Sequence, residues 1–358
     1  MKKMNIQSLV RENIQNLTPY GSARDEFDSG ILLDANENSF GAPFADDMAL
    51  NRYPMPYQEE LRDKIAAFRG LKRENVFVGV GSDEAIDLLF RIFCRPGKDR
   101  VIINPPTYGM YKVSANINDV AVDEVLLTES FQLQPERILE TVEPETKIIF
   151  ICSPNNPTGN SVNKHDVIKV LEGFNGIVVV DEAYIDFSRQ GSLADNLKDF
   201  ENLVVLQTMS KSFGLAGIRL GKALANPEII SYMMKVKAPY NINKLTSNKA
   251  AQAFSNIGRL TKNIQAILKE RERVIGKLVA FSQVEKVYPT DANFVMFKIS
   301  DALNVYKNLA DEGVVIRYRG NEPHCENCLR LTVGTTGEND RFFSALEKVL
   351  NTSEVTKG

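Results

Sequence analysis

One lysine stands in a stretch of the chain whose composition is unusual for a surface loop. The stretch TMSKSFGLAGIRLG, residues 208–221, places a hydroxyl on each side of Lys211 and isolates Arg219 among apolar residues. Apolar side chains such as that of Phe213 favour burial. Burial disfavours the protonated form of a lysine and leaves a neutral amine, which is the form that attacks a carbonyl carbon to give an imine. The stretch therefore predicts a nucleophilic amine.

Three other polar loops each follow an apolar run. The sequence GVGSDE at residues 79–84 passes through a glycine turn into a helical pattern. A helix N-terminus of this kind can bind phosphate, although the same residues also suit a plain helix cap. The sequence SPNNPTG at residues 153–159 contains two prolines, two asparagines and a glycine, which predict a turn. A turn needs only one or two such residues. The sequence DEAY at residues 181–184 ends an apolar run with an acid, which either caps a helix or places a carboxylate at the base of a cleft.

The elements that must position these loops alternate between strand and helix patterns. Apolar, strand-like runs occupy residues 76–80, 101–104, 147–152, 177–181, 203–207 and 220–225. Between several of them the apolar residues have helical spacing, as at 86–93 and 167–174. This alternation predicts an α/β domain around a mostly parallel sheet. Ligands of such sheets collect beyond the carboxyl ends of the strands, which is where the polar loops fall.

The pattern changes after about residue 227. Helical patterns at 227–236 and 245–281 lead to strand patterns at 293–299, 314–319 and 328–333, and a helix at 338–350 closes the chain. We therefore predict a small α+β domain after a large cofactor-binding α/β domain. The predicted limits are 46–270 for the large domain and 271–358 for the small one, with an N-terminal segment, 1–45, packing against the small domain.

The composition is that of an ordinary globular protein, with 43% hydrophobic and 25% charged residues. The net charge of −3 and the absence of a dense basic run argue against nucleic acid or a membrane surface as partner. No signal peptide and no apolar stretch long enough to cross a bilayer is recognised, so we expect a cytoplasmic protein.

Four cysteines are too few for a disulfide framework in a chain of this length. Cys325 and Cys328 form a CxxC beside His324, but a structural zinc site needs four ligands and no others are at hand. We expect reduced thiols and no metal.

Three of the motifs, in their order along the chain, resemble those of the aspartate-aminotransferase-like (fold type I) pyridoxal-phosphate enzymes. They are SPNNPTG, DEAY and SKSFGLAGIR. Further segments are similar to the histidinol-phosphate aminotransferase subfamily: LTPY at 17–20, LDANEN at 33–38, RYP at 52–54 and CLRLTVG at 328–334. The matches extend from about residue 17 to 335. The resemblance implies a seven-stranded, mostly parallel sheet flanked by helices, and pyridoxal 5'-phosphate as cofactor.

The resemblance also implies roles for residues around the cofactor. Lys211 would bind the cofactor as an imine and then move the substrate proton, and Asp181 would pair with the pyridine nitrogen. Tyr184 and Asn156 would hydrogen-bond the phenolic oxygen, and Tyr108 would stack on the ring. The cofactor phosphate would be held by Arg219, Ser210, Thr208 and the backbone at Ser82, Asp83 and Glu84.

Substrate recognition is implied for a second set of residues. Arg330 and Arg317 would bind the substrate phosphate, because a guanidinium fork suits phosphate as well as carboxylate. Tyr20, Asn36 and Tyr240 would complete the substrate site. Tyr53 would reach the cofactor phosphate of a partner subunit, which implies a homodimer.

The reaction that the resemblance implies is a transamination in histidine biosynthesis. The amino group would pass between histidinol phosphate and 2-oxoglutarate, with imidazole acetol phosphate and glutamate as products. An aromatic or broad-specificity aminotransferase and a threonine-phosphate decarboxylase remain as alternatives on the same fold. A DNA-binding regulator is disfavoured because the motifs begin by residue 17, and a nicotinamide-linked oxidoreductase because no GxGxxG follows the first strand.

Overall fold

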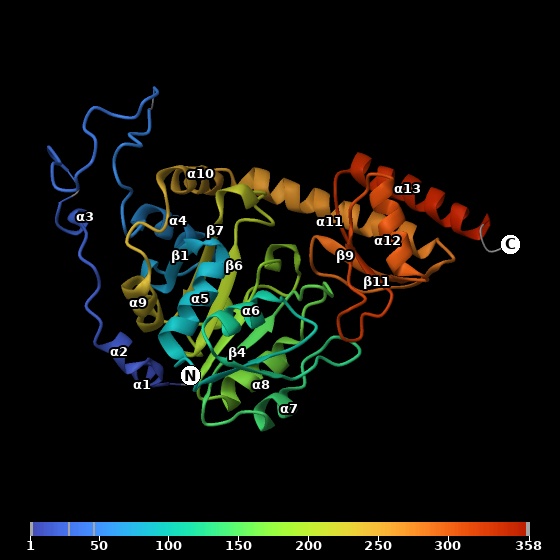
Figure 1. Cartoon of the computed structure of the whole chain (residues 1–358), viewed down its shortest axis with the longest axis horizontal. Coiled ribbons are helices and arrows are strands. Elements are labelled where there is room, and N and C mark those ends of the chain that lie inside the picture. The colour runs from blue at the N-terminus through green and yellow to red at the C-terminus, as the bar shows by residue number, and fades with distance from the viewer. Residues whose placement is uncertain (1–2, 28, 46, 356–358) are drawn as a thin grey trace.

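The computed structural model describes residues 3–27, 29–45 and 47–355, which fold around two β-sheets (Figure 1). The strands of the larger sheet are β1 (Val76–Val80), β2 (Arg100–Ile103), β3 (Ala121–Glu124), β4 (Thr146–Cys152), β5 (Ile177–Asp181), β6 (Leu203–Thr208) and β7 (Leu220–Ala225). Their order is β1-β7-β6-β5-β4-β2-β3, and only β7 runs antiparallel to its neighbours. The predicted α/β class with a mostly parallel seven-stranded sheet is confirmed.

Helices cover both faces of this sheet, so its strands are continuously apolar. Alternate residues of each strand enter different cores: Ile149 and Ile151 of β4 pack on one side, and Ile148 and Phe150 on the other. The helices of the first side are α4 (Glu59–Arg69), α7 (Pro135–Glu140), α8 (Lys164–Gly173) and α10 (Lys244–Phe254). Those of the second side are α5 (Gly81–Phe93), α6 (Met110–Ile117) and α9 (Pro227–Val236).

The smaller sheet is antiparallel and lies in the last third of the chain. Its order is β10-β11-β9-β8, with strands β8 (Val284–Val287), β9 (Phe294–Ile299), β10 (Arg317–Tyr318) and β11 (Cys328–Thr332). A separate core forms between this sheet and the helices α11 (Ile257–Val279), α12 (Ala302–Asp311) and α13 (Thr336–Val355). The small α+β domain therefore exists, while the limits 46–270 and 271–358 stay a prediction, with α11 crossing between the two parts.

The long helix predicted over 245–281 is wrong, because it is two helices. The chain breaks between α10 and α11 at Ser255 and Asn256, residue types that compete with the helical backbone for hydrogen bonds. The Asn256 side chain donates to the carbonyl oxygen of Gln252 over 2.8 Å and so caps the end of α10.

The N-terminal segment predicted over 1–45 does not pack against the small domain in its described residues, 3–27 and 29–45. It begins with the short helices α1 (Ile6–Leu9) and α2 (Glu12–Gln15), whose Ile6, Val10 and Ile14 join the core of the large domain. Val10 lies in extended backbone between the two helices, and together with Ile6 and Ile14 it anchors this part of the segment on the large domain. The chain then continues to α3 (Ala23–Glu26), on the side of the molecule away from the small domain (Figure 1). No helix of the described ranges has the length and apolarity that a membrane span requires.

Candidate active site

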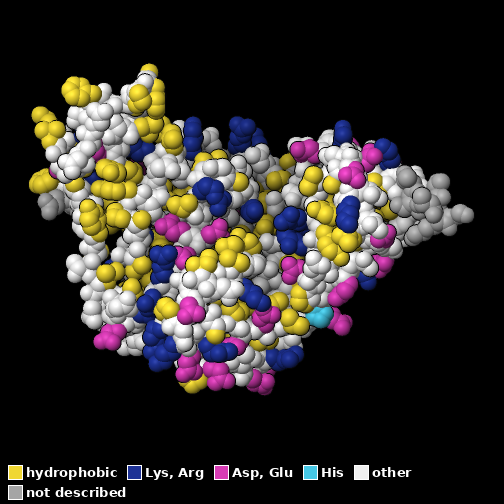
Figure 2. All heavy atoms as spheres, viewed as in Figure 1, with side chains coloured by type: hydrophobic (Ala, Val, Ile, Leu, Met, Phe, Trp, Pro, Cys, Tyr) yellow, Lys and Arg dark blue, Asp and Glu magenta, His cyan; other side chains and the backbone are white. Residues whose placement is uncertain are grey.

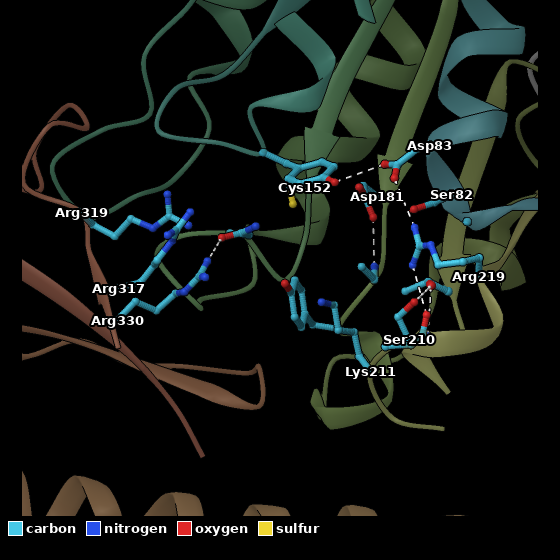
Figure 3. A pocket seen from close by; sticks show the side chains of 17 residues that line it. Ser82, Asp83, Cys152, Asp181, Ser210, Lys211, Arg219, Arg317, Arg319 and Arg330 are labelled. Carbon is cyan, nitrogen blue, oxygen red and sulfur yellow. Dashed lines mark hydrogen bonds and ion pairs between the residues drawn. The ribbon is translucent and has the colours of Figure 1, made fainter. Parts of the chain in front are cut away.

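A cavity of about 350 Å³ lies where the loops after the large-sheet strands meet the β10–β11 hairpin (Figure 3). Twelve of its lining residues were predicted from the sequence: Ser82, Asp83, Tyr108, Asn156, Asp181, Tyr184, Thr208, Ser210, Lys211, Arg219, Arg317 and Arg330. Loops after β1, β2, β4, β5 and β6 contribute because their carboxyl ends share one edge of the sheet. Arg219 precedes β7, whose antiparallel direction brings its beginning to the same edge.

One end of the cavity is built to hold an anion. The helix α5 starts there at Gly81, so its free backbone N–H groups and its dipole favour negative charge. Arg219 lies beside it, with Nη2 3.6 Å from the Asp83 carboxylate. Ser210 lies on the same side as Arg219 in Figure 3, and its hydroxyl is 3.0 Å from that of Thr208. The arrangement of N–H, O–H and guanidinium groups suits a phosphate.

Close backbone contacts keep this end in shape. The N–H of Gly81 donates to the Arg219 carbonyl over 2.8 Å, and Gly81 has a positive φ of 70°. Gly221 on β7 lies so close to the start of α5 that an added Cβ would come within 2.1 Å of the Ser82 nitrogen. Glycine is therefore required at both positions, at Gly81 by conformation and at Gly221 by space.

Asp181 is a buried carboxylate at the end of β5. It accepts hydrogen bonds from the Tyr111 hydroxyl at 2.8 Å and from the Ala183 N–H at 3.0 Å. Burial raises its pKa to about 6, although these two donors act in the opposite direction. A carboxylate in this setting is suited to pair with a cation that enters the cavity, such as a protonated ring nitrogen.

Lys211 carries the amine that the sequence pointed to. Its pKa is lowered, first by burial and then by the positive charge of Arg330, so the neutral form is favoured relative to an exposed lysine. Its Nζ lies 5.5 Å from the centre of the Tyr184 ring. Burial raises the pKa of the Tyr184 phenol, which therefore stays a hydrogen-bond donor at neutral pH.

Asn156 connects the large sheet to the small domain. Its side-chain oxygen accepts a hydrogen bond from Nη1 of Arg330 on β11, which leaves its amide N–H₂ free to donate into the cavity. Arg330 also lies over the Phe294 ring, 5.1 Å from its centre. On the other side, the Tyr108 hydroxyl donates to Asp83 over 3.2 Å. Both bonds orient groups around the cavity before any ligand binds.

Five predicted site residues do not line this cavity. Glu84 accepts a hydrogen bond from the Val80 N–H and holds the loop instead. Tyr53 and Tyr240 stack on each other with ring centres 4.6 Å apart. Tyr20, 75% exposed, borders a different and smaller cavity, and Asn36 is exposed with a φ of 55°. Tyr20, Asn36 and Tyr53 belong to the N-terminal arm, which is described over residues 20–27, 29–45 and 47–57, and Tyr240 contacts it through Tyr53. The positions of these four residues therefore depend on where that arm lies.

Five lining residues lie outside the predicted set: Gly81, Ala183 and Ala216, which belong to the predicted loops, and Cys152 and Arg319. A further residue, Tyr111, supports the cavity from behind. Cys152 ends β4, and Arg319 follows β10 two residues after Arg317. Tyr111 lies behind Asp181 and is fully buried. The alternation of Arg317 and Arg319 in VVIRYR was a signal for Arg319, because strand residues two apart share a face. Nothing in the sequence pattern indicates that Tyr111 contacts Asp181.

Cys325 and Cys328 are both buried in the small domain and free of disulfide bonds. Within the described residues, no group of three or more His, Cys, Asp or Glu side chains is arranged to hold a metal ion.

Comparisons with known proteins agree on one family. The model of aminotransferase class I and II matches residues 27–346. The histidinol-phosphate aminotransferase of Flavobacterium johnsoniae is 48% identical over 356 residues, covering 98% of this chain and all of the relative. Among solved structures, the histidinol-phosphate aminotransferase of Clostridium acetobutylicum has a TM-score of 0.78 at 27% identity, covering 85% of this chain and 92% of that one.

A second solved structure is the enzyme of the same name from Sinorhizobium meliloti, in complex with pyridoxal-5'-phosphate. It has a TM-score of 0.78 at 23% identity, covers 89% of this chain and 90% of that one, and supports the fold. The chain belongs to the class I and II aminotransferases and, within them, to the histidinol-phosphate aminotransferase family.

Proposed function

We propose that this chain transfers an amino group between L-histidinol phosphate and 2-oxoglutarate, with imidazole acetol phosphate and glutamate as products, in histidine biosynthesis. One observation carries the proposal: Lys211 lies between an anion-binding end of the cavity and a cluster of arginines on its opposite side (Figure 3). A cofactor phosphate and a substrate phosphate need two such separate sites. Membership of the family supports the same reaction.

Pyridoxal 5'-phosphate is the cofactor of this family, and the cavity fits it. The end formed by Ser82, Ser210 and Arg219 suits its phosphate, and the buried carboxylate of Asp181 suits its protonated ring nitrogen. Lys211 supplies the amine for its aldehyde. When bound, this cofactor supplies an electron-accepting ring that stabilises negative charge at the substrate Cα.

The residues around the cofactor would move the substrate proton and hold the cofactor ring in place. Lys211, once released, would take the proton from Cα of the amino donor through its neutral Nζ and return it in the reverse direction. Asp181 would keep the ring nitrogen protonated, because a carboxylate within contact stabilises the cation. Tyr184 and Asn156 would donate to the phenolic oxygen, and Tyr108 would cover the ring face.

The substrate phosphate would lie against the small domain. Arg330 and Arg317 face the cavity from adjacent strands, and a guanidinium gives a phosphate two parallel hydrogen bonds. Tyr20, Asn36 and Tyr240 would complete this end of the site once the N-terminal arm is in place.

The N-terminal arm, which the structure describes over residues 20–27, 29–45 and 47–57, supports a homodimer. Five of its large apolar side chains are strongly exposed, by 63% to 101%: Phe27, Ile31, Leu33, Phe40 and Phe44. Figure 2 shows them as a yellow group at the upper left. The arm is nevertheless held in shape, since Arg24 pairs with Asp34 at 2.7 Å and Arg52 with Glu37 at 2.8 Å. An ordered arm with an apolar surface needs a partner, and we propose a second copy of this chain, reached by Tyr53.

Mixing two defective variants tests the shared site. Lys211→Ala lacks the amine, and Tyr53→Phe lacks the hydroxyl that would reach the partner's cofactor phosphate. If the sites are shared, mixed dimers contain one site with both groups, so the mixture is more active than the two variants measured separately. No gain after verified subunit exchange would contradict the role of Tyr53.

Absorbance titration of the cofactor-loaded enzyme tests the substrate. Histidinol phosphate, phenylalanine and threonine phosphate are added separately while the visible band of the bound cofactor is followed. We expect loss of the band at low concentration with histidinol phosphate alone. An equal response to phenylalanine would make this a broad aromatic aminotransferase, and carbon dioxide release from threonine phosphate would make it a decarboxylase.

A further inference from the structure

A third arginine shares the substrate end of the cavity with Arg317 and Arg330. Arg319 lines the same cavity, and Figure 3 shows the three guanidinium groups extending from the β10–β11 hairpin toward it. Only Arg317 and Arg330 are needed to explain a pair of hydrogen bonds to an anion. The binding of such an anion therefore does not by itself explain why Arg319 also lines the cavity.

The register of the hairpin explains why the three side chains converge. Arg317 lies directly opposite Arg330, and directly opposite residues of an antiparallel pair share a face. Arg319 is two residues after Arg317, so it returns to that face, while Tyr318 between them points into the small-domain core. The Arg319 N–H donates to the Cys328 carbonyl over 2.9 Å and continues the ladder, which fixes the position of Arg319 relative to β11.

The cluster has more positive than negative charge. Arg319 forms an ion pair with Glu322, whose Oε1 lies 3.6 Å from its Nη1. Neither Arg317 nor Arg330 forms an ion pair with a carboxylate in the part of the chain that the structure describes. The Nε of Arg319 is buried and has no hydrogen-bond partner among the described residues. The cluster thus carries positive charge that no carboxylate balances, and it has an N–H donor without an acceptor among the described residues.

The three guanidinium groups also repel one another. Burial lowers the pKa of Arg330 to about 10, and the positive charges of Arg319 and Arg317 act in the same direction. The pKa of Arg319 is lowered by burial and by Arg317, against the effect of Glu322. A ligand that carries two negative charges relieves this repulsion more than a ligand that carries one.

We infer that Arg319 sets the preference of the site for a phosphate-ended amino donor over a carboxylate-ended one, by adding a third guanidinium to the distal phosphate. A phosphate monoester carries a charge of about −1.5 to −2 at pH 7 and three acceptor oxygens, whereas a carboxylate carries a single charge and two oxygens. Glutamate must use the same end of the cavity in the other half of the cycle, and it gains little from the third cation. This inference rests on the proposed function, and it names the residue that discriminates between the two donors.

The test compares two amino donors and four proteins: wild type, Arg319→Gln, Arg319→Lys and Arg341→Gln. Arg341 is an exposed arginine of α13 outside the cavity, and its variant controls for loss of a positive charge on the small domain. We expect Arg319→Gln to raise the KM for histidinol phosphate about 10- to 100-fold. The kcat for histidinol phosphate and the KM for glutamate should change less than about 3-fold, as expected for one singly charged contact near water. Arg319→Lys keeps the positive charge but loses the two parallel N–H groups of the guanidinium. Its KM for histidinol phosphate should therefore lie between those of wild type and Arg319→Gln.

Binding of inorganic phosphate to the cofactor-loaded enzyme gives a second readout, by titration calorimetry. The cofactor phosphate then occupies the other anion site, so the titration reports the arginine cluster. Weaker binding to Arg319→Gln than to Arg341→Gln supports the inference. Equal loss of kcat/KM for both donors, or unchanged phosphate binding, would overturn it and leave Arg319 a structural part of the hairpin. Failure of wild type to use histidinol phosphate would overturn the proposed function, and phosphate binding would still decide the role of Arg319.

Discussion

The hydroxyl of Tyr111 and the carboxylate of Asp181 are joined by a hydrogen bond of 2.8 Å, and both groups are buried. Tyr111 is held by the Phe150 ring, which stacks on it at 4.8 Å, and by the edge-on contact with Tyr108 at 5.6 Å. A hydroxyl in this position stabilises the ionised carboxylate, which otherwise has a pKa raised by burial. Tyr111 therefore acts on the proposed cofactor through Asp181, as a positioning residue.

Replacing Tyr111 with Phe should move the acid limb of the pH–activity profile upward. Without the donor, the pKa of Asp181 rises further, so the carboxylate becomes protonated at a higher pH. A hydrogen bond to a charged group contributes about 1.5–3 kcal/mol, which corresponds to a shift of about 1–2 pH units. The profiles of kcat/KM and of the cofactor absorbance against pH measure this. Tyr232→Phe on α9, away from the cavity, is the matched control, and identical profiles for the two variants would contradict the role of Tyr111.

Replacing Lys211 with Ala should abolish turnover and the visible absorbance of the covalently bound cofactor. No other amine lines the cavity among the described residues, so nothing there can replace Nζ. Cofactor should still bind, because the anion-binding end is intact, and equilibrium dialysis can show it. The exposed Lys198→Ala serves as the control. Residual turnover above a few per cent of wild type would assign the amine to another residue.

Replacing Gly221 with Ala should weaken cofactor binding and lower the melting temperature. The new methyl group would meet the backbone of Gly81 and Ser82, which has no flexible side chain to give way. Overpacking of this kind costs about 1–3 kcal/mol. In the nearby loop Gly217 has open space around it, so Gly217→Ala should be close to wild type. Equal effects of the two substitutions on the cofactor Kd would rule out the close approach of β7 to α5.

Replacing Lys222 with Met should stabilise the protein at neutral and acid pH. The amine of Lys222 is fully buried, 5.6–5.8 Å from the ring centres of Phe68, Phe213 and Phe254. Its Nζ has no hydrogen-bond partner among the described residues. Burial lowers its pKa to about 7 from 10.5, with Arg69 acting in the same direction and Asp186 and Glu182 against it.

The sign of the pH dependence follows from that lowered pKa. Folding releases a proton between about pH 7 and pH 10.5, so the stability of the wild type rises with pH across this window. The gain from Lys222→Met is then largest at or below about pH 7, on the order of a few kcal/mol, and fades toward pH 10. Melting temperatures of the cofactor-free protein from pH 6 to 10 measure it. The exposed Lys198→Met should show no such trend, and a gain that stays constant with pH would mean that the ionisation of Lys222 is not its cause.

Much of the large sheet was predictable from the sequence. The bounds of β1, β5 and β7 match the apolar runs at 76–80, 177–181 and 220–225, because strands buried on both faces are apolar without interruption. β3 (Ala121–Glu124) was not predicted, since it is a partly exposed edge strand with two acids. The one predicted helix over 245–281 was wrong, because a periodic pattern does not show a break of two residues.

For the site, the sequence by itself determined which chemical groups are present: an amine at Lys211 and a guanidinium at Arg219 on the loop between β6 and β7, and an acid at Asp181, the last residue of β5. Residue type and spacing along the chain are enough to recognise such local patterns. Only the tertiary structure decided that Tyr111 contacts Asp181, and that Arg319 joins Arg317 and Arg330, because these contacts depend on packing between segments and on strand register. The same holds for the N-terminal segment, which the sequence predicted to pack against the small domain and whose first helices instead join the core of the large domain.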